Sequence, residues 1–223
     1  MLETQRSAAG EQITSISRNT SHPFSGFIRA NIESVRESLW RYSCGAIISG
    51  GETGVNTAAF DIASRLRIPH SGLAPRGFIN ETGEINPSFK TRMIEVSDSI
   101  SYFDRSLLAS DLSRYPYARA RTFEEQIQLN AFLSNATLIL TSGEPSANDL
   151  VAFNTATRSN GANRVFMIDM SWDVESQTSR AREWLRSEPV ALLNIAGSRE
   201  GSSEVFGFSP YERSAEICWN VLR

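Results

Sequence analysis

The chain has 223 residues and a formal net charge of −3 at pH 7, with 40% hydrophobic and 21% charged residues. This length and balance are typical of a globular protein with one well-buried core. The absence of a basic excess argues against nucleic-acid binding. No apolar run approaches the ~20 residues needed to span a bilayer, and the N-terminus does not resemble a secretory signal. We therefore expect a cytoplasmic protein with neither a nucleic-acid nor a membrane partner.

Cysteine and histidine are scarce. The two cysteines, Cys44 and Cys218, lie far apart and outside any Cys-x-x-Cys pair, so we expect two buried thiols in a reducing cytosol. With only His22 and His70 available, a zinc site built from His and Cys is not expected. We predict no metal-ligating residues.

The N-terminal part differs in composition from the rest. Residues 1–26 are rich in Ser, Thr, Gln, Asn and Arg, so we expect a poorly ordered arm. Apolar residues recur at helical spacing over 27–40, which predicts a short docking helix at the start of a domain spanning 27–223.

Strands and helices then alternate. Apolar runs predict strands at 45–50, 137–143, 164–170 and 191–197. Helical periodicity predicts helices at 53–67, 121–135, 146–160, 174–187 and from Tyr211 onward. Continuously apolar strands separated by helices indicate an α/β fold with a parallel sheet covered on both faces. In such folds ligands bind beyond the carboxyl ends of the strands.

The segment 49-SGGETG-54 is typical of an anion-binding turn. Gly50 and Gly51 let the chain leave the strand sharply, and Thr53 is expected to cap the following helix, whose first N–H groups attract anions. The pattern is neither G-x-G-x-x-G nor a P-loop, and a tight turn without a ligand is the alternative. Glu52 would compete with an anion. It could instead complement the helix dipole, accept a hydrogen bond from a sugar or pterin, or bind a cation.

Several polar residues follow other predicted elements. Arg76, between Pro and Gly, could clamp an anion or lie in solvent. Asn130 lies on the apolar face of its helix, where an amide bonds either to a loop backbone or to a ligand. In the loop 141–151, Ser146, Asn148 and Asp149 are all helix-capping types, and one cap would leave polar groups for a ligand. Arg199 follows the last strand.

Four stretches carry a resemblance to a known family. They are SGGETGVNTAAFDIA (49–63), RIPHSGLAPRGFINETG (67–83), NAFLSNATLIL (130–140) and LNIAGSREG (193–201). Over roughly residues 45–222, in collinear order, the chain resembles the bacterial and algal molybdenum cofactor carrier proteins. These are Rossmann-like relatives of the lysine-decarboxylase-like and cytokinin-activating phosphoribohydrolases.

The resemblance implies a Rossmann-like homo-oligomer, typically a tetramer. It would bind the molybdenum cofactor, or an oxyanion such as molybdate, through glycine-rich loops without transforming it. Four glycines and one threonine match the family motifs directly: Gly50, Gly51, Thr53, Gly54 and Gly77. Arg76 keeps the charge of a family lysine. The candidate binding residues are Gly50, Gly51, Glu52, Thr53, Gly54, Arg76, Gly77, Asn130, Ser142, Gly143, Ser146, Asn148, Asp149 and Arg199.

The chain also departs from the family pattern. Glu52, Asn56 and Thr57 replace Gln, Asp and Arg, and 147-AND-149 stands where the hydrolase relatives have a Gly-Gly-Thr phosphate loop. Gln126 replaces an arginine, and an insertion lies between about 99 and 119. Asn154 replaces the relatives' glutamate, which removes their acid–base group for N-glycosidic cleavage.

We therefore predict a non-catalytic carrier for the molybdenum cofactor or a related anionic, phosphorylated small molecule. One alternative is a nucleotide-cleaving, phosphoribohydrolase-like enzyme that uses Glu52 or Asp149 as its carboxylate. The other alternative is a sensor of a nucleotide-derived signal whose N-terminal arm contacts a partner.

Overall fold

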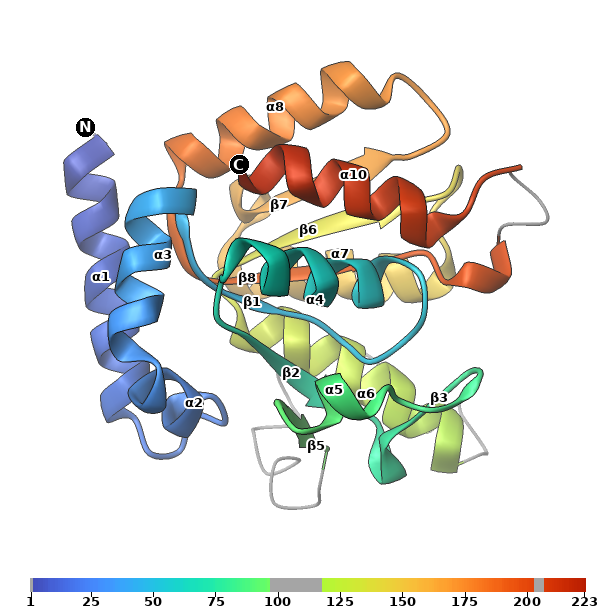
Figure 1. Ribbon diagram of the computed structural model, residues 1–223, viewed down its shortest axis with the longest axis horizontal. Helices are drawn as coiled ribbons and strands as arrows, with labels where there is room; N and C mark the ends of the chain where they lie inside the picture. The colour runs from blue at the N-terminus through green and yellow to red at the C-terminus, as the bar shows by residue number, and fades with distance from the viewer. Residues whose placement is uncertain (1, 97–117, 203–206) are drawn as a thin grey trace.

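The computed structural model describes residues 2–96, 118–202 and 207–223, and a six-stranded parallel sheet forms its centre (Figure 1). The strands are β1 (Cys44–Ile48), β2 (His70–Ala74), β5 (Met93–Glu95), β6 (Ala136–Thr141), β7 (Val165–Asp169) and β8 (Val190–Gly197). Their spatial order is β5-β2-β1-β8-β6-β7, so the last strand of the chain lies between β1 and β6. This sheet confirms the predicted Rossmann-like α/β class.

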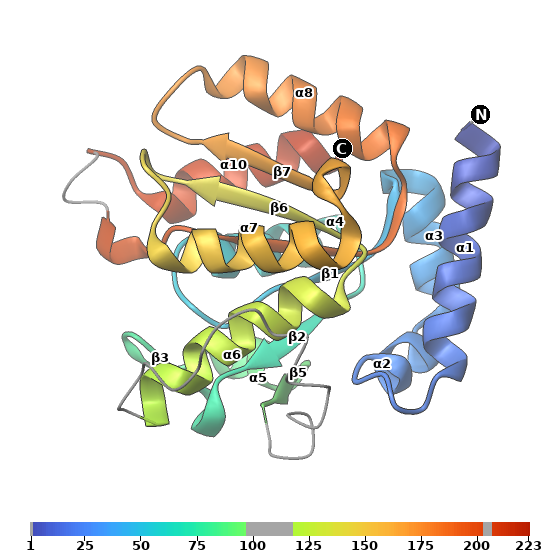
Figure 2. The same ribbon diagram turned by 180° about the vertical axis from the view of Figure 1, so that it is seen from behind.

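Helices cover both faces of the sheet (Figures 1 and 2). One face carries α4 (Val55–Leu66), α8 (Val174–Ser187) and α10 (Pro210–Leu222). The other carries α3 (Ile32–Tyr42), α6 (Ala118–Leu133) and α7 (Ala147–Asn160). β1, β2 and β6 are buried along their whole length because each is covered on both sides, which explains why their sequences do not alternate. The stripe predicted for α4 is buried: Val55, Ala58, Ala59, Ile62, Ala63 and Leu66.

The N-terminal residues differ from the expected disordered arm. They form α1 (Leu2–Arg18) and α2 (Ser25–Ala30), and α1 packs along α3 (Figure 1). Ala9, Ile13 and Ile16 are buried. Ile13 reaches the start of β1, where a Cβ on Gly45 would lie 3.2 Å from its Cδ1. The expectation of a poorly ordered arm is therefore wrong, because three apolar residues at helical spacing anchor an otherwise polar segment.

Short elements join β2 to β5 and flank the later strands. They are η1 (Arg76–Phe78), β3 (Ile79–Asn80), β4 (Gly83–Glu84), α5 (Pro87–Lys90), η3 (Ala162–Arg164) and η4 (Glu200–Ser202). β3 and β4 form a small antiparallel pair beside the main sheet. The insertion expected between 99 and 119 lies almost entirely outside the described residues.

Cys44 and Cys218 are both free and buried, and burial raises the pKa of each thiol to about 12. In the described part of the chain, no helix is long and apolar enough to cross a membrane.

Candidate functional site

The loop after β1 is packed too tightly for side chains at two of its glycines. A Cβ on Gly50 would collide with the Glu52 carboxylate and lie 2.5 Å from Gln126 Nε2. Gly54 has φ +71°, and a Cβ there would lie 2.5 Å from the main-chain oxygen of Ser198. Because β8 lies beside β1, the loops after these two strands meet. The Val55 N–H donates to the same Ser198 oxygen at 3.1 Å.

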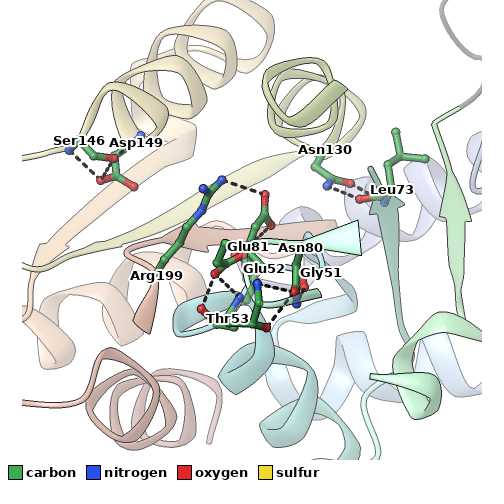
Figure 3. Close-up of polar contacts among 12 residues, drawn as sticks. Gly51, Glu52, Thr53, Leu73, Asn80, Glu81, Asn130, Ser146, Asp149 and Arg199 are labelled. Carbon is green, nitrogen blue, oxygen red and sulfur yellow. Dashed lines mark hydrogen bonds and ion pairs between the residues drawn. The ribbon is translucent and has the colours of Figure 1, made fainter. Parts of the chain in front are cut away.

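Thr53 does not cap α4 as the sequence predicts. The N-cap residue is Gly54, and no side chain caps the helix. The Thr53 N–H instead donates to Glu81 Oε1 at 2.9 Å, and the Thr53 hydroxyl donates to the same carboxylate (Figure 3). The Glu200 N–H donates to Thr53 Oγ1 at 3.1 Å. The N–H and the hydroxyl of Thr53 are thus engaged by an internal carboxylate from the turn between β3 and β4.

Carboxylates of the protein also occupy the starts of two other helices at this edge. Before α7, the Ser146 N–H and hydroxyl donate to Asp149 Oδ2 at 2.8 and 2.7 Å, and the Asp149 N–H donates to Ser146 Oγ at 3.3 Å. This pair is a capping box. At α10, Glu200 accepts from Ser209 Oγ at 2.6 Å and from the Tyr211 N–H at 3.0 Å. Helix N-termini do lie at this edge, and internal carboxylates engage the N–H groups of Thr53, Ser146 and Tyr211 there.

Glu52 is buried at the centre of the edge, with 2% of its surface exposed. Asn56 Nδ2 donates to its Oε2, and Arg199 Nη2 lies 3.6 Å from its Oε1. Burial raises the pKa of Glu52, whereas the charge of Arg199 opposes this shift. A buried carboxyl group with a raised pKa at the carboxyl edge of a parallel sheet is a typical feature of functional sites.

Arg199 connects the first loop with the loop after β6. Its guanidinium lies 5.5 Å from the centroid of the Phe123 ring and forms the ion pair with Glu52 (Figure 3). Burial raises the pKa of Asp149, and both the Ser146 hydrogen bonds and the Arg199 charge lower it. The Arg199 charge therefore acts on two buried carboxyl groups, one in the loop after β1 and one in the helix that follows β6.

Several buried oxygens around Gly50 have no hydrogen-bond partner among the described residues. They are Asn56 Oδ1, Gln126 Oε1 and Glu52 Oε1, the last of which has only its ion pair with Arg199. The hydroxyl of Ser142, the residue after β6, also lacks a hydrogen-bond partner within the described part of the chain. Buried polar atoms in folded proteins are almost always hydrogen-bonded. These oxygens are mainly acceptors, so the group that would satisfy them is rich in N–H or O–H donors. Water or a ligand could supply such donors.

Asn130 has a structural role instead of the predicted ligand role. It is 2% exposed, its Oδ1 accepts from the Leu73 N–H at 2.9 Å, and its Nδ2 donates to the Leu73 oxygen at 3.2 Å (Figure 3). The amide replaces a neighbouring strand at a point of β2 beyond the last paired residue of β1. The amide therefore bonds to backbone, as one alternative predicted, but to that of a strand and not of a loop.

The remaining predicted residues lie in the loops at the same edge of the sheet, and most of them have partners within the protein. Gly77 has φ +76°, and its N–H donates to Glu95 Oε1 at 2.6 Å, while Arg76 is exposed after β2. The Gly143 N–H donates to Asp169 Oδ1 at 2.9 Å. Gly51 is held through its carbonyl, which accepts from Asn80 Nδ2 at 3.0 Å. Asn148 is partly exposed in the first turn of α7.

Three contributors escaped the predicted set. Asn56 and Gln126 were noted only as departures from the family, although a departure beside a motif glycine is itself a signal. Glu81 had no signal, because only the fold brings it to Thr53. Asn154, which replaces the relatives' glutamate, is exposed. Among the described residues no group of three or more His, Cys, Asp or Glu side chains could hold a metal ion.

Comparisons with known proteins agree with this architecture. The fold matches a solved structure of a protein named "putative molybdenum carrier protein" from Syntrophus aciditrophicus, with a TM-score of 0.63 and 22% identity. The match covers 82% of this chain and 96% of that one, and it confirms the fold. The comparison with curated proteins gives no match. The family model of the circularly permutated YpsA SLOG family matches residues 47–213, well over half of the chain. The chain therefore belongs to the circularly permutated YpsA SLOG family.

Proposed function

We propose that this protein binds a small molecule at the carboxyl edge of its sheet without transforming it. The observation that carries the proposal is the pair of buried amide oxygens on Asn56 and Gln126, which have no hydrogen-bond partner among the described residues and whose side chains meet Glu52 beside Gly50. A heterocycle with adjacent N–H groups satisfies such acceptors. Arg199, the cation that pairs with Glu52, suits an anionic group on the same ligand.

The molybdenum cofactor is the first candidate for this cargo. A pterin ring presents adjacent N–H donors to the acceptors around Gly50, and the phosphate attached to it would interact with Arg199. Molybdate alone fits less well, since internal carboxylates already engage the N–H groups of Thr53, Ser146 and Tyr211 and leave fewer donors for a bare oxyanion. Consistent with the candidate, a molybdenum carrier name accompanies the matched structure.

Binding has more support than catalysis. Asp149 is engaged in the capping box of α7, and Glu52 is buried against Asn56 and Arg199. Both carboxyl groups already have partners within the protein. The sensor alternative relied on a loose N-terminal arm, and α1 is instead packed on α3. Turnover of nucleoside monophosphates that is abolished in Glu52→Gln would nevertheless overturn the non-catalytic proposal.

A homo-oligomer in the cytoplasm is also proposed. Trp172 is 74% exposed on the loop after β7, at the ligand edge, and Leu150 is exposed in the first turn of α7. Two large apolar side chains at one edge suit contact with a second copy. Light scattering of the wild type and of Trp172→Ser tests this, and a monomeric wild type would refute it.

The test of the ligand is purification under reducing, anaerobic conditions, followed by measurement of bound molybdenum and pterin fluorescence. Molybdenum and pterin at about one per chain would support the cofactor carrier. Gln126→Leu and Asn56→Leu remove acceptors and are expected to lower the bound amount. Asn154→Leu, which changes an exposed amide, serves as the matched control. Absence of molybdenum, pterin and any nucleotide from the wild type would overturn the proposal.

A further inference from the structure

A second cluster of charged side chains lies at the opposite end of the sheet, where the strands begin. Helices in this fold run against the strands, so α3, α4 and α10 all end near the amino ends of β1 and β2 (Figure 1). Each end carries arginine. Arg41 is in the last turn of α3, Arg65 is in the last turn of α4, Arg67 follows α4, and Arg223 follows α10.

These four arginines line one cavity of about 490 Å³. Two of the guanidiniums stack on aromatic rings that also line it: Arg41 lies 5.2 Å from the Tyr42 ring centroid, and Arg223 lies 5.5 Å from that of Trp219. No carboxylate side chain lines the cavity. Within the described residues, none of the four guanidiniums has a carboxylate within 4.0 Å.

Helix dipoles explain part of this arrangement. The C-terminal end of a helix carries about half a negative charge, and an arginine there is stabilising. Three helix ends offset fewer than two of the four guanidinium charges by this measure. The excess is unusual in a protein whose overall charge is −3. The arrangement thus leaves positive charge that the helix ends do not require.

The positive groove continues beyond this cavity. Arg67 also lines a neighbouring cavity of about 750 Å³, together with Ser64, His70 and Arg92. Arg92 Nη1 lies 2.6 Å from His70 Nε2, and His70 Nδ1 lies 3.0 Å from the Ile68 oxygen. Burial lowers the pKa of His70, so the neutral ring accepts a hydrogen bond from Arg92 and does not offset its charge. Arg67 therefore stands between two cavities that both present guanidinium donors.

We propose that this arginine-lined cavity binds the polyphosphate group of a small molecule. Guanidinium groups bind phosphate oxygens through paired, charge-assisted hydrogen bonds, and several guanidiniums together favour a ligand with more than one phosphate. The ligand is either a free polyphosphate or the phosphate chain of a nucleotide. The site is separate from the carboxyl edge, so it stands or falls independently of the proposed carrier function.

Calorimetric titration with tripolyphosphate and with ATP, at low and at physiological salt, tests the site. Arg65→Gln combined with Arg67→Gln is expected to weaken binding about tenfold or more for each guanidinium removed. Arg158→Gln combined with Arg180→Gln changes the charge equally on α7 and α8, and it should have little effect. Equal affinity for the two ligands indicates that phosphates alone are recognised, and tighter ATP binding indicates a nucleotide.

Two results would overturn the proposal. One is the absence of binding by the folded wild type with either ligand at low salt. The other is an equal loss of affinity in both double variants, which would show a general effect of net charge instead of a site. Because ATP could also bind at the carboxyl edge, Gln126→Leu is included, and it should leave the affinity for tripolyphosphate unchanged.

Discussion

Replacing Asn130 with alanine would remove the two hydrogen bonds that the side chain makes to Leu73. Both main-chain groups of Leu73 would then lie unpaired beside a buried position, since Asn130 is 2% exposed. A buried unsatisfied polar group costs about 1–3 kcal/mol, so two such groups with partial relaxation cost about 2–4 kcal/mol. For a chain of this size, the expected fall in Tm is about 5–15 °C.

Urea unfolding followed by circular dichroism measures this free energy directly. Asn154→Ala removes an exposed amide from α7, and its unfolding free energy should stay within about 0.5 kcal/mol of the wild type. The folded Asn130→Ala protein should still bind the ligand, because the amide bonds to strand β2. An unfolding free energy of Asn130→Ala equal to that of the Asn154→Ala control would refute this reasoning.

Three further predictions concern titration, capping and thiols. Because the pKa of Glu52 is raised in the folded state, that state binds more protons above pH 4.5, and the group destabilises the protein increasingly as pH rises. Glu52→Gln should therefore raise the unfolding free energy at pH 8 more than at pH 5, as measured by urea titration at both values. Ser146→Ala breaks the capping box of α7 and should cost about 1 kcal/mol in the same assay. Cys44 and Cys218 should both resist a thiol reagent at pH 8 in the folded protein and react in urea, because each pKa is about 12.

The first two of these predictions have a matched control variant, and the third has an outcome that would contradict it. Glu183→Gln neutralises an exposed carboxylate on α8 and should not reproduce the pH dependence; if it does, the effect reflects net charge and not burial. Ser176→Ala lies on the exposed surface of α8, and a loss equal to that of Ser146→Ala would contradict the capping assignment. Rapid labelling of either thiol in the folded protein would show that it is accessible.

Local patterns in the sequence were enough to predict most of the fold. The apolar runs that became β1, β6 and β8 were recognisable because a strand buried on both faces must be apolar throughout. β7 was also predicted from an apolar run, but it lies at the edge of the sheet and is mostly only partly buried. The buried stripe of α4 showed in the sequence at a spacing of three and four residues. α1 was missed because its apolar residues are few, and only contact with α3 makes them sufficient.

The site divides in a similar way. The sequence by itself predicted the edge at which a ligand would bind, because glycines and capping residues that follow strands must gather at the carboxyl end of a parallel sheet. It also determined that Ser146 and Asp149 begin a helix, since that signal is contained within four consecutive residues.

Only the tertiary structure decided which groups at this edge remain available for a ligand. Glu81 reaches Thr53 across 28 residues of sequence, and Asn130 reaches Leu73 across 57. Such pairings depend on the order of the strands, which no local pattern encodes. Hydrogen-bonding groups that are already paired within the protein cannot also hold a ligand. The groups that remain at the predicted anion site are the acceptor oxygens of Asn56 and Gln126 near Gly50, with the cation Arg199 close by.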